Sequence, residues 1–324
     1  MSADAVQVRD GSQVAEARRR ALAATAQLGF DATLAGQVAL VVTELATNLL
    51  KHGHGGEVLL MRGERRLDVL ALDAGPGMRD VAACLADGYS TAGTLGQGLG
   101  AVRRQASDVR VASWGGLGTA VLARFGEPAL EHETLGAVVV AKPGEEACGD
   151  GWCAHEDDEA RTLMVVDGLG HGIEAAVAAH AAVTRFQRAR GLAPQALLEA
   201  LHEALRPTRG AAVAVARLHW RSATVSFAGL GNIAAALIGA DGAVRRLVSH
   251  NGIAGHNARK IQVFDYPCRE GLLVMHSDGV STHWSLDRYP GLLRAHPLLV
   301  AGILYHHHGR RRDDATVVAA RLAR

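Results

Sequence analysis

The chain has 324 residues, of which 48% are hydrophobic and 21% are charged, so a packed core is expected and wholesale disorder is excluded. The length suggests two domains of ordinary size. A formal net charge of +1 and an aromatic content of 4% argue against recognition through global charge or base stacking. We therefore expect neither nucleic acid nor a membrane surface as a partner.

The sequence carries no sign of secretion or membrane insertion. Residues 1–4 are polar and acidic, unlike a signal peptide, and no apolar run reaches the roughly 18 residues that a membrane span needs. The cysteines are scattered and predict no disulfide framework. A zinc site at Cys148, Cys153 and His155 is the alternative, but this spacing matches no common zinc motif. A cytoplasmic protein with reduced thiols is expected.

Two helices are predicted at the start of the chain, over residues 12–28 and from about 32 to 52. Ser12 and Asp31 are their predicted N-caps. The second helix carries Glu44 and Asn48, which are four residues apart and therefore share one face, among mostly apolar neighbours. A polar pair on a largely buried helix needs a partner, which is either a mutual hydrogen bond or a bound ligand or metal.

Two glycine-rich turns follow this helix. Predicted strands over 57–61 and 67–72 lead into Asp73-x-Gly75-x-Gly77, and Gly96-x-Gly98-x-Gly100 opens a further helix. A Gly-x-Gly-x-Gly at a helix start exposes backbone N–H groups to an anion. The motif does not follow a strand directly, so a Rossmann-type site is disfavoured. Predicted strands over 109–113 and 119–125 complete this part of the chain.

Several of these motifs, taken in order, resemble the GHKL (Bergerat-fold) ATP-binding family over about residues 5–125. They are the Glu44/Asn48 pair, the two glycine boxes and Gly118-Thr119. Within it, the chain looks most like small serine kinases that act on anti-anti-sigma (STAS-domain) proteins. The resemblance implies an α/β sandwich with a mixed sheet and helices on one face. It also implies an ATP–Mg²⁺ site in which Asn48 holds Mg²⁺, Glu44 activates the attacking group and Asp73 reads the adenine amino group. The remaining nucleotide-binding residues that it implies are Gly75, Gly77, Gly96, Gly98, Gly100 and Thr119.

The strand pattern breaks over residues 126–133, which we interpret as a linker between domains at 1–126 and 134–324. The second domain is predicted to begin with a strand over 135–141. Helices after residues 173 and 194 and around 292–306 are expected among many short strands, the last over 315–320. Such a pattern predicts an α+β sandwich.

Aspartates stand at the ends of several of these predicted strands. The apolar run 163–166 ends in Asp167-Gly168, and the run 272–276 ends in Ser277-Asp278-Gly279. A single Asp-Gly is usually only a turn, but the repetition points to a site. Carboxylates at strand ends suit a hard divalent cation, whereas unpaired carboxylates held together would repel and take up protons. The further acids are Asp150 upstream and Asp313 and Asp314 just before the terminal strand.

This half resembles the 2C-type metal-dependent serine/threonine phosphatases, closest to the branch of sporulation stage II protein E, over about residues 134–322. The resemblance implies a β-sandwich flanked by helices and a pair of Mn²⁺ or Mg²⁺ ions. The implied ligands are Asp150, Asp167, Asp278 and Asp313, with the carbonyl of Gly168, and with Asp314 as the alternative to its neighbour. The ions would neutralise the phosphate and activate a water for in-line attack without a protein nucleophile. Catalysis would then depend on Asp150, Asp167 and Asp278.

Other polar residues have weaker interpretations. The candidates to hold the substrate phosphate are Lys142, Arg161 and Arg185, and His171 either packs the turn or contacts substrate. The three histidines at 306–308 cannot all face one ion from a helix, so a solvated helix end is expected there.

Taken together, the sequence predicts a bacterial signalling enzyme. Its C-terminal half would remove phosphate from serine or threonine of a STAS-type anti-anti-sigma or stress-complex scaffold protein. Its N-terminal half would bind ATP and act as the opposing serine kinase. The alternative is a nucleotide-sensing or sigma-factor-binding module that regulates the phosphatase without kinase activity. A catalytically dead scaffold is disfavoured because the aspartates are intact.

Overall fold

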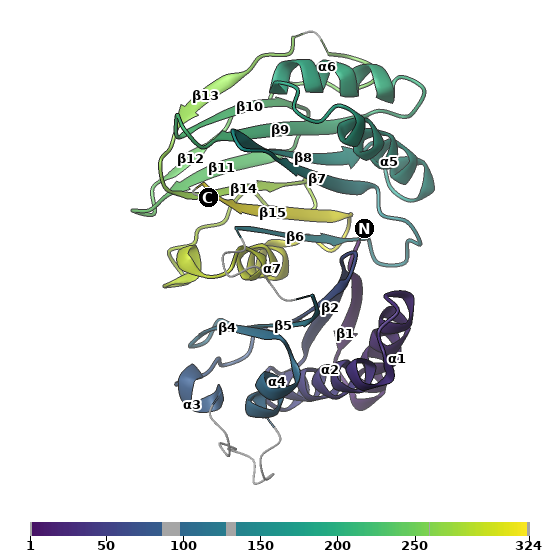
Figure 1. The fold of residues 1–324 in the computed structure, drawn as a ribbon, viewed down its shortest axis with the longest axis vertical. Helices are drawn as coiled ribbons and strands as arrows, with labels where there is room; N and C mark the ends of the chain where they lie inside the picture. The colour runs from purple at the N-terminus through teal and green to yellow at the C-terminus, as the bar shows by residue number, and fades with distance from the viewer. Residues whose placement is uncertain (1, 86–97, 128–133, 259, 323–324) are drawn as a thin grey trace. The chain divides into compact units, whose positions relative to one another are not determined.

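The computed structural model describes residues 2–85, 98–127, 134–258 and 260–322, which form two compact units (Figure 1). Setting aside residues 1 and 2, the N-terminal unit comprises Ala3–Glu133 together with Tyr289–His307. The C-terminal unit comprises Thr134–Arg288 and His308–Arg324. A segment from late in the sequence is therefore part of the N-terminal unit.

The N-terminal unit is built on one five-stranded sheet with the order β1-β2-β3-β5-β4. The predicted α+β class is confirmed, but every pairing between neighbouring strands is antiparallel where a mixed sheet was expected. Short connections between β2 and β3 and between β4 and β5 require antiparallel pairs. The strands are β1 (Asp4–Val8), β2 (Gly56–Arg62), β3 (Arg66–Leu72), β4 (Asp108–Trp114) and β5 (Gly118–Gly126).

The helices of this unit that precede residue 134 are α1 (Gly11–Gln27), α2 (Ala32–His52), α3 (Val81–Leu85) and α4 (Leu99–Gln105). The N-cap of α1 is Asp10, not Ser12 as predicted. Asp10 Oδ1 accepts from the Ser12 amide at 2.8 Å, and the Gln13 side chain returns to the Asp10 amide at 3.2 Å, which completes a capping box. Asp31 caps α2 as predicted, by accepting from the Leu34 amide at 2.7 Å.

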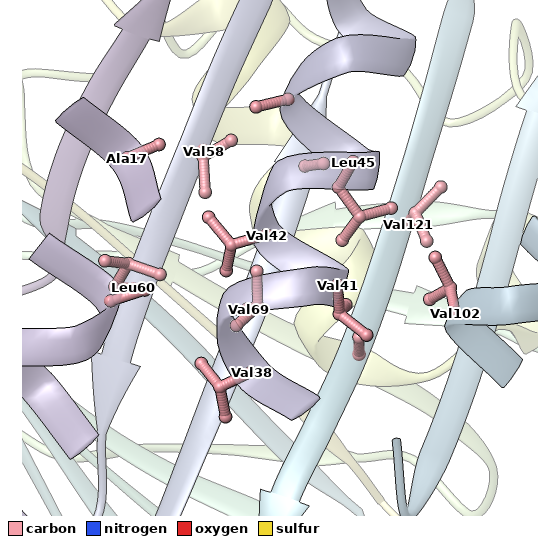
Figure 2. Packing of buried hydrophobic residues seen from close by; sticks show 14 of the residues in the cluster. Ala17, Val38, Val41, Val42, Leu45, Val58, Leu60, Val69, Val102 and Val121 are labelled. Atoms are coloured by element: carbon pink, nitrogen blue, oxygen red, sulfur yellow. The ribbon is translucent and has the colours of Figure 1, made fainter. Parts of the chain in front are cut away.

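Helix α2 packs its apolar stripe against the sheet (Figure 2). Val38, Val42 and Leu45 lie over buried residues of the strands, among them Val58 and Val69. Buried aliphatic side chains of this size contribute about 1.5–3 kcal/mol each. This packing fixes the helix that carries Glu44 and Asn48.

Of the described helices, α2 is the one that could cross a membrane by length and mean hydropathy, although the sequence predicted none. Its apolar stripe packs on the sheet, and its other face carries Glu44 and Asn48. A core helix of a globular unit passes the same test of length and hydropathy. We therefore assign α2 to the core of the N-terminal unit.

The C-terminal unit has two five-stranded sheets, with the orders β13-β10-β9-β8-β7 and β12-β11-β14-β15-β6, and the predicted sandwich is confirmed. Helices α5 (Ile173–Arg188) and α6 (Pro194–Leu205) pack on the first sheet. The first sheet consists of β7 (Asp150–Glu156), β8 (Ala160–Gly168), β9 (Ala211–His219), β10 (Thr224–Leu230) and β13 (Phe264–Pro267). The second consists of β6 (Leu135–Val140), β11 (Ala234–Gly239), β12 (Val244–Arg246), β14 (Gly271–His276) and β15 (Ala315–Arg321).

The continuous apolar run of β8 follows from its burial on both faces. Leu163 and Val165 belong to the cluster that includes Leu273 and Met275 of the second sheet, whereas Met164 and Val166 belong to the cluster with α5 and α6. Successive strand residues point to opposite faces, so a strand covered on both sides is apolar at every position. The run therefore ends, at Asp167, where the sandwich core ends.

Between β14 and β15 the chain forms a short 3₁₀ turn, Leu292–Arg294, and helix α7 (Pro297–His308). Residues 289–307 of this segment belong to the N-terminal unit. Gly302 packs so closely on β3 that a Cβ added there would lie 2.6 Å from Leu70 Cδ2. His306–His308 are partly buried, so the predicted solvated helix end is wrong.

Candidate functional site

The N-terminal unit contains a cavity of about 480 Å³ between α2, the turn after β3 and the start of α4. The structure brings six of the predicted nucleotide-binding residues to its wall, namely Glu44, Asn48, Asp73, Gly77, Gly98 and Thr119. Gly100 lies buried within α4, and Gly75 lies in the adjacent turn without lining the cavity. Gly96 lies outside the described residues.

Asp73 places a buried carboxylate on the wall of this cavity. It is 9% exposed, its Oδ1 accepts from the Gly75 amide at 2.9 Å, and its own amide donates to the Thr119 carbonyl at 3.0 Å. Burial raises the pKa of Asp73 above its usual range, while the backbone hydrogen bonds from Gly75 and Thr119 oppose that rise. The side chain is held by backbone and can accept from an exocyclic amine in the cavity.

The turns around Asp73 pack at distances that only glycine permits. Gly118 has a φ of +94°, and a Cβ there would lie 1.9 Å from the Asp73 carbonyl oxygen. A Cβ on Gly75 would lie 2.8 Å from the Cα of Gly53. The glycine pattern is therefore explained by close packing of backbone around Asp73.

The cavity also has residues that sequence reasoning missed, among them Lys51, Met78 and Arg79. Lys51 lies three residues after Asn48 on the same helix, and this spacing was a usable signal. Met78 and Arg79 follow the glycine turn and carry no periodic signal. The two cations give the cavity wall positive groups that suit an anionic ligand.

In the C-terminal unit, the predicted aspartates converge at the ends of neighbouring strands. Asp150 begins β7, Asp167 lies next to the last residue of β8, and the two stand directly opposite each other in the strand register. Asp278 follows β14, and Asp313 precedes β15, which is paired with β14. Residues far apart in sequence are thus assembled by strand pairing.

Asp150 carries an orphaned buried oxygen. Its Oδ2 accepts from the Ser277 hydroxyl at 2.6 Å, but its buried Oδ1 has no hydrogen-bond partner among the described residues. Burial raises the pKa of Asp150 to about 7, although the hydrogen bond from Ser277 opposes the shift. An unsatisfied buried carboxylate oxygen is costly and requires a cation or a proton.

The other carboxylates act on one another electrostatically. Burial, followed by the charges of neighbouring aspartates, raises the pKa of Asp167 to about 9. The pKa of Asp278 is also raised, by burial and by Asp313, against an opposing effect of Arg310. The neighbours that raise the pKa of Asp167 are Asp150, Asp278, Asp313 and Asp314. Such mutual destabilisation of charge is expected when carboxylates converge without a cation.

Asp313 and Asp314 differ in their surroundings. Asp314 is 3% exposed, and its two oxygens accept from the amides of Lys142 and Gly149, each at 2.8 Å. It therefore fixes the loop that leads into Asp150. Asp313 is less buried and accepts from the amide of Asp314 at 3.0 Å. Of the two predicted ligands, this geometry favours Asp313.

The donor set fits hard divalent cations, because it consists of carboxylate oxygens with an unsatisfied member. Among the described residues, no three His, Cys, Asp or Glu side chains form a ready-made site for one ion. Mg²⁺ keeps several water ligands and needs only one or two carboxylates from the protein. Gly168, the predicted carbonyl ligand, ends β8, and its amide donates to the Gly149 carbonyl at 2.9 Å.

Two neighbours of the aspartates were not predicted for this site. Asn232 Nδ2 donates to Asp278 Oδ2 at 2.7 Å, and no sequence pattern marks this loop asparagine. The Ser277 hydroxyl, which donates to Asp150, also accepts from the Thr316 amide at 2.9 Å. It thereby links Asp150 of the first sheet to β15 of the second.

The weaker sequence candidates have other roles. Arg161 donates to Thr134 Oγ1 at 2.6 Å and to Glu156, and is 7% exposed, so it does not serve as a free phosphate anchor. His171 Nδ1 lies 2.6 Å from Glu145 Oε1, which supports a role in packing the turn. The four cysteines are free thiols, and burial raises the pKa of Cys148, so a thiolate zinc ligand is disfavoured there.

Fold and site together define a 2C-type phosphatase unit joined to an ATPase-type unit. Comparisons with known proteins agree: residues 8–125 match the histidine kinase-like ATPase domain, and residues 157–323 match Stage II sporulation protein E (SpoIIE). Since the second match covers more than half of the chain, this protein belongs to the SpoIIE family. It is a serine/threonine phosphatase whose N-terminal unit is similar to a protein kinase.

Three similar proteins match this chain over part of its length. The chain is 33% identical over 101 residues to serine/threonine-protein kinase RsbT of Bacillus subtilis (strain 168), which is 30% of this chain and 76% of that protein. A second relative is a solved chain from the bacterial stressosome system. It shares 31% identity with this protein at a TM-score of 0.53, over 58% of this chain and 98% of its own. RsbX, solved with magnesium, has the same fold at 19% identity and a TM-score of 0.52, over 59% of this chain and 97% of its own. The predicted fusion of two families is confirmed.

The contrast between the adjacent acids gives a first prediction. Asp314→Asn should lower the free energy of unfolding of the metal-free protein by about 1–3 kcal/mol, because an amide nitrogen would face a backbone N–H. Asp313→Asn should leave that free energy within about 0.5 kcal/mol and should weaken Mn²⁺ binding instead. Urea unfolding in EDTA and Mn²⁺ titration measure the two effects. If Asp314→Asn weakened Mn²⁺ binding and Asp313→Asn did not, Asp314 would be the ligand instead.

The raised pKa values predict a pH dependence of the metal-free protein. The folded pKa values of Asp150 and Asp167, about 7 and about 9, lie above the roughly 3.9 of an unfolded aspartate. The folded state therefore binds more protons between pH 4 and 9, and stability falls as pH rises through this window. In EDTA the melting temperature should drop from pH 6 to pH 9, and Mg²⁺ should abolish the slope. A melting temperature in EDTA that rises to pH 9 would contradict the clustered geometry.

Proposed function

We propose that the C-terminal unit hydrolyses phosphoserine or phosphothreonine on a STAS-type anti-anti-sigma or stress-complex protein, with two Mn²⁺ or Mg²⁺ ions. The observation that carries the hydrolase assignment is the convergence of Asp150, Asp167 and Asp278, with one buried oxygen of Asp150 left unsatisfied. The similarity of part of this chain to a solved chain from the bacterial stressosome system supports the class of partner. We further propose a cytoplasmic location and domains at 1–126 and 134–324.

Each residue of this site has a part in the proposed reaction. Bound cations would neutralise the phosphate and lower the pKa of an attacking water. Asp150, Asp167, Asp278 and Asp313 would hold them. Ser277 orients Asp150, and Asn232 orients Asp278, through the hydrogen bonds described above. Partners of this kind preserve ligand geometry, and their loss commonly costs 10- to 100-fold in metal affinity or activity.

For the N-terminal unit we propose ATP–Mg²⁺ binding and transfer of the γ-phosphate to a serine of the same partner. Asn48 would hold the metal, Glu44 would act on the attacking hydroxyl and Asp73 would accept from the adenine amine, and all three line one cavity. Phosphoryl transfer depends on positioning and charge neutralisation, which a cavity with carboxylate, amide and cationic side chains can supply. The similarity to kinase RsbT supports this assignment.

The second candidate function for the N-terminal unit is nucleotide sensing without phosphoryl transfer. Residues 289–307, which lie in sequence between two of the predicted metal ligands, belong to this unit. A unit that holds part of the phosphatase sequence can act on the phosphatase without being a kinase. The two functions are compatible, and separate experiments test them.

Hydrolysis of p-nitrophenyl phosphate with Mn²⁺ tests the phosphatase directly. Asp278→Asn should reduce kcat/KM by more than about 100-fold, because a ligand is lost rather than one of its supports. Asp241→Asn is a matched control, since this exposed aspartate caps a turn by accepting from the Ala243 amide. Equal activity of the two variants, or activity that resists EDTA, would refute the two-metal site.

Incubation with ATP and STAS proteins of the same genome, followed by mass spectrometry, tests the kinase. The wild type should add phosphate to a serine of one such protein. Glu44→Ala should bind nucleotide within about threefold of the wild type yet lose transfer, because only the reacting hydroxyl depends on this carboxylate. Absence of transfer by the wild type, with nucleotide bound, would exclude the kinase and leave the sensor.

A further inference from the structure

The chain leaves and re-enters the phosphatase unit between two of its proposed metal ligands. After Asp278 it continues to Arg288, then forms residues 289–307 of the N-terminal unit, and returns at His308. Asp313 follows five residues later. Both ends of one segment held by the N-terminal unit are thus joined covalently to the strands that present metal ligands.

Helix α7 is bound to the face of the N-terminal sheet opposite α2. Along β2 and β3, Val58, Leu60, Val69 and Ala71 belong to the core under α2. Strand alternation places the residues between them on the other face. There Tyr305 donates from its hydroxyl to the buried Glu57 Oε1 at 3.1 Å, and Gly302 packs against Leu70 and Leu72.

The start of the segment is held by Trp114, at the end of β4. The indole Nε1 donates to the Pro290 carbonyl at 2.9 Å. The same ring stacks edge-on against Tyr289, with 5.1 Å between ring centroids and 76° between planes. A directed hydrogen bond and an aromatic contact together fix residues 289 and 290 relative to the β4–β5 turn.

That turn is in direct contact with the glycine turn of the nucleotide cavity. Gly77, which lines the cavity, has a φ of +74°, and a Cβ there would lie 2.2 Å from the Trp114 carbonyl oxygen. The amide of Met78 donates to Ser113 Oγ at 2.7 Å, and the amide of Gly116 donates to the Pro76 carbonyl at 2.9 Å. A ligand that moves residues 76–78 must therefore move the backbone that carries Trp114.

We propose that nucleotide in the N-terminal cavity sets the activity of the metal centre through Trp114 and residues 289–307. This inference rests on the proposed phosphatase function and names its regulator. The contacts run from Gly77 to Trp114, from Trp114 to Pro290, and then along the chain to Asp278 on one side and Asp313 on the other. A ligand shifts such an equilibrium by as much as its affinities for the two arrangements differ, and typical couplings amount to 5- to 150-fold.

Trp114→Phe tests the proposal, because it keeps an aromatic ring and removes the N–H that binds Pro290. Trp220→Phe is the matched control, since its indole Nε1 also donates to a backbone carbonyl, that of Asp157 at 3.3 Å, within the C-terminal unit. Each protein is assayed with p-nitrophenyl phosphate at fixed free Mn²⁺, with and without saturating AMP-PNP, and its Kd for AMP-PNP is measured separately.

In the wild type and in Trp220→Phe, AMP-PNP should change kcat/KM by about fivefold or more. In Trp114→Phe, the nucleotide-free rate and the nucleotide Kd should stay within about twofold, while the response to AMP-PNP falls below twofold. A wild type that binds AMP-PNP without a change in rate overturns the inference, as does an undiminished response in Trp114→Phe. Hydrogen exchange of residues 297–307 in the wild type is a second readout, and protection unchanged by AMP-PNP also overturns it.

Failure of the underlying function has a different signature. No Mn²⁺-dependent hydrolysis in the absence of nucleotide refutes the proposed phosphatase together with the inference. No binding of AMP-PNP refutes the proposed nucleotide site together with the inference. Intact hydrolysis and intact binding without mutual effect refute the inference alone.

Discussion

The main constraint on the C-terminal unit is that its clustered aspartates cannot all be charged unless a cation lies between them. Asp150 and Asp167 are opposite each other across β7 and β8, and burial together with the charges of neighbouring aspartates raises the pKa of each. Two sheets are tied together at this point through the Ser277 hydroxyl. Folding therefore brings together carboxylates that bound cations would neutralise, and in the proposed reaction those cations would act on the phosphate.

The N-terminal unit depends instead on close packing of backbone around one carboxylate. Gly75 and Gly118 let three turns pack around Asp73, and the result is a carboxylate fixed by backbone on the wall of a cavity. The same close packing passes through Gly77 to Trp114. Because of this close packing, the neighbours of the glycine turn share any displacement of it.

Much of this was predictable because the informative signals are local. An apolar run that ends in Asp-Gly marks a strand end, and Glu44 and Asn48 are paired by helical spacing alone. What sequence could not supply were contacts across long separations, such as Asp314 with Gly149 and Asn232 with Asp278. The docking of residues 289–307 on the N-terminal sheet was missed for the same reason, since an apolar helix does not reveal which sheet covers it. The N-cap of α1 at Asp10 was predictable from local sequence, because aspartate is a preferred N-cap residue.

Anomalous diffraction from crystals of the protein grown with Mn²⁺ tests the proposed two-metal site most directly. Two manganese peaks a few ångströms apart are expected among Asp150, Asp167, Asp278 and Asp313. Asp314 should still accept from the amides of Lys142 and Gly149. A map without manganese at these aspartates, or with manganese held only elsewhere, would contradict this assignment.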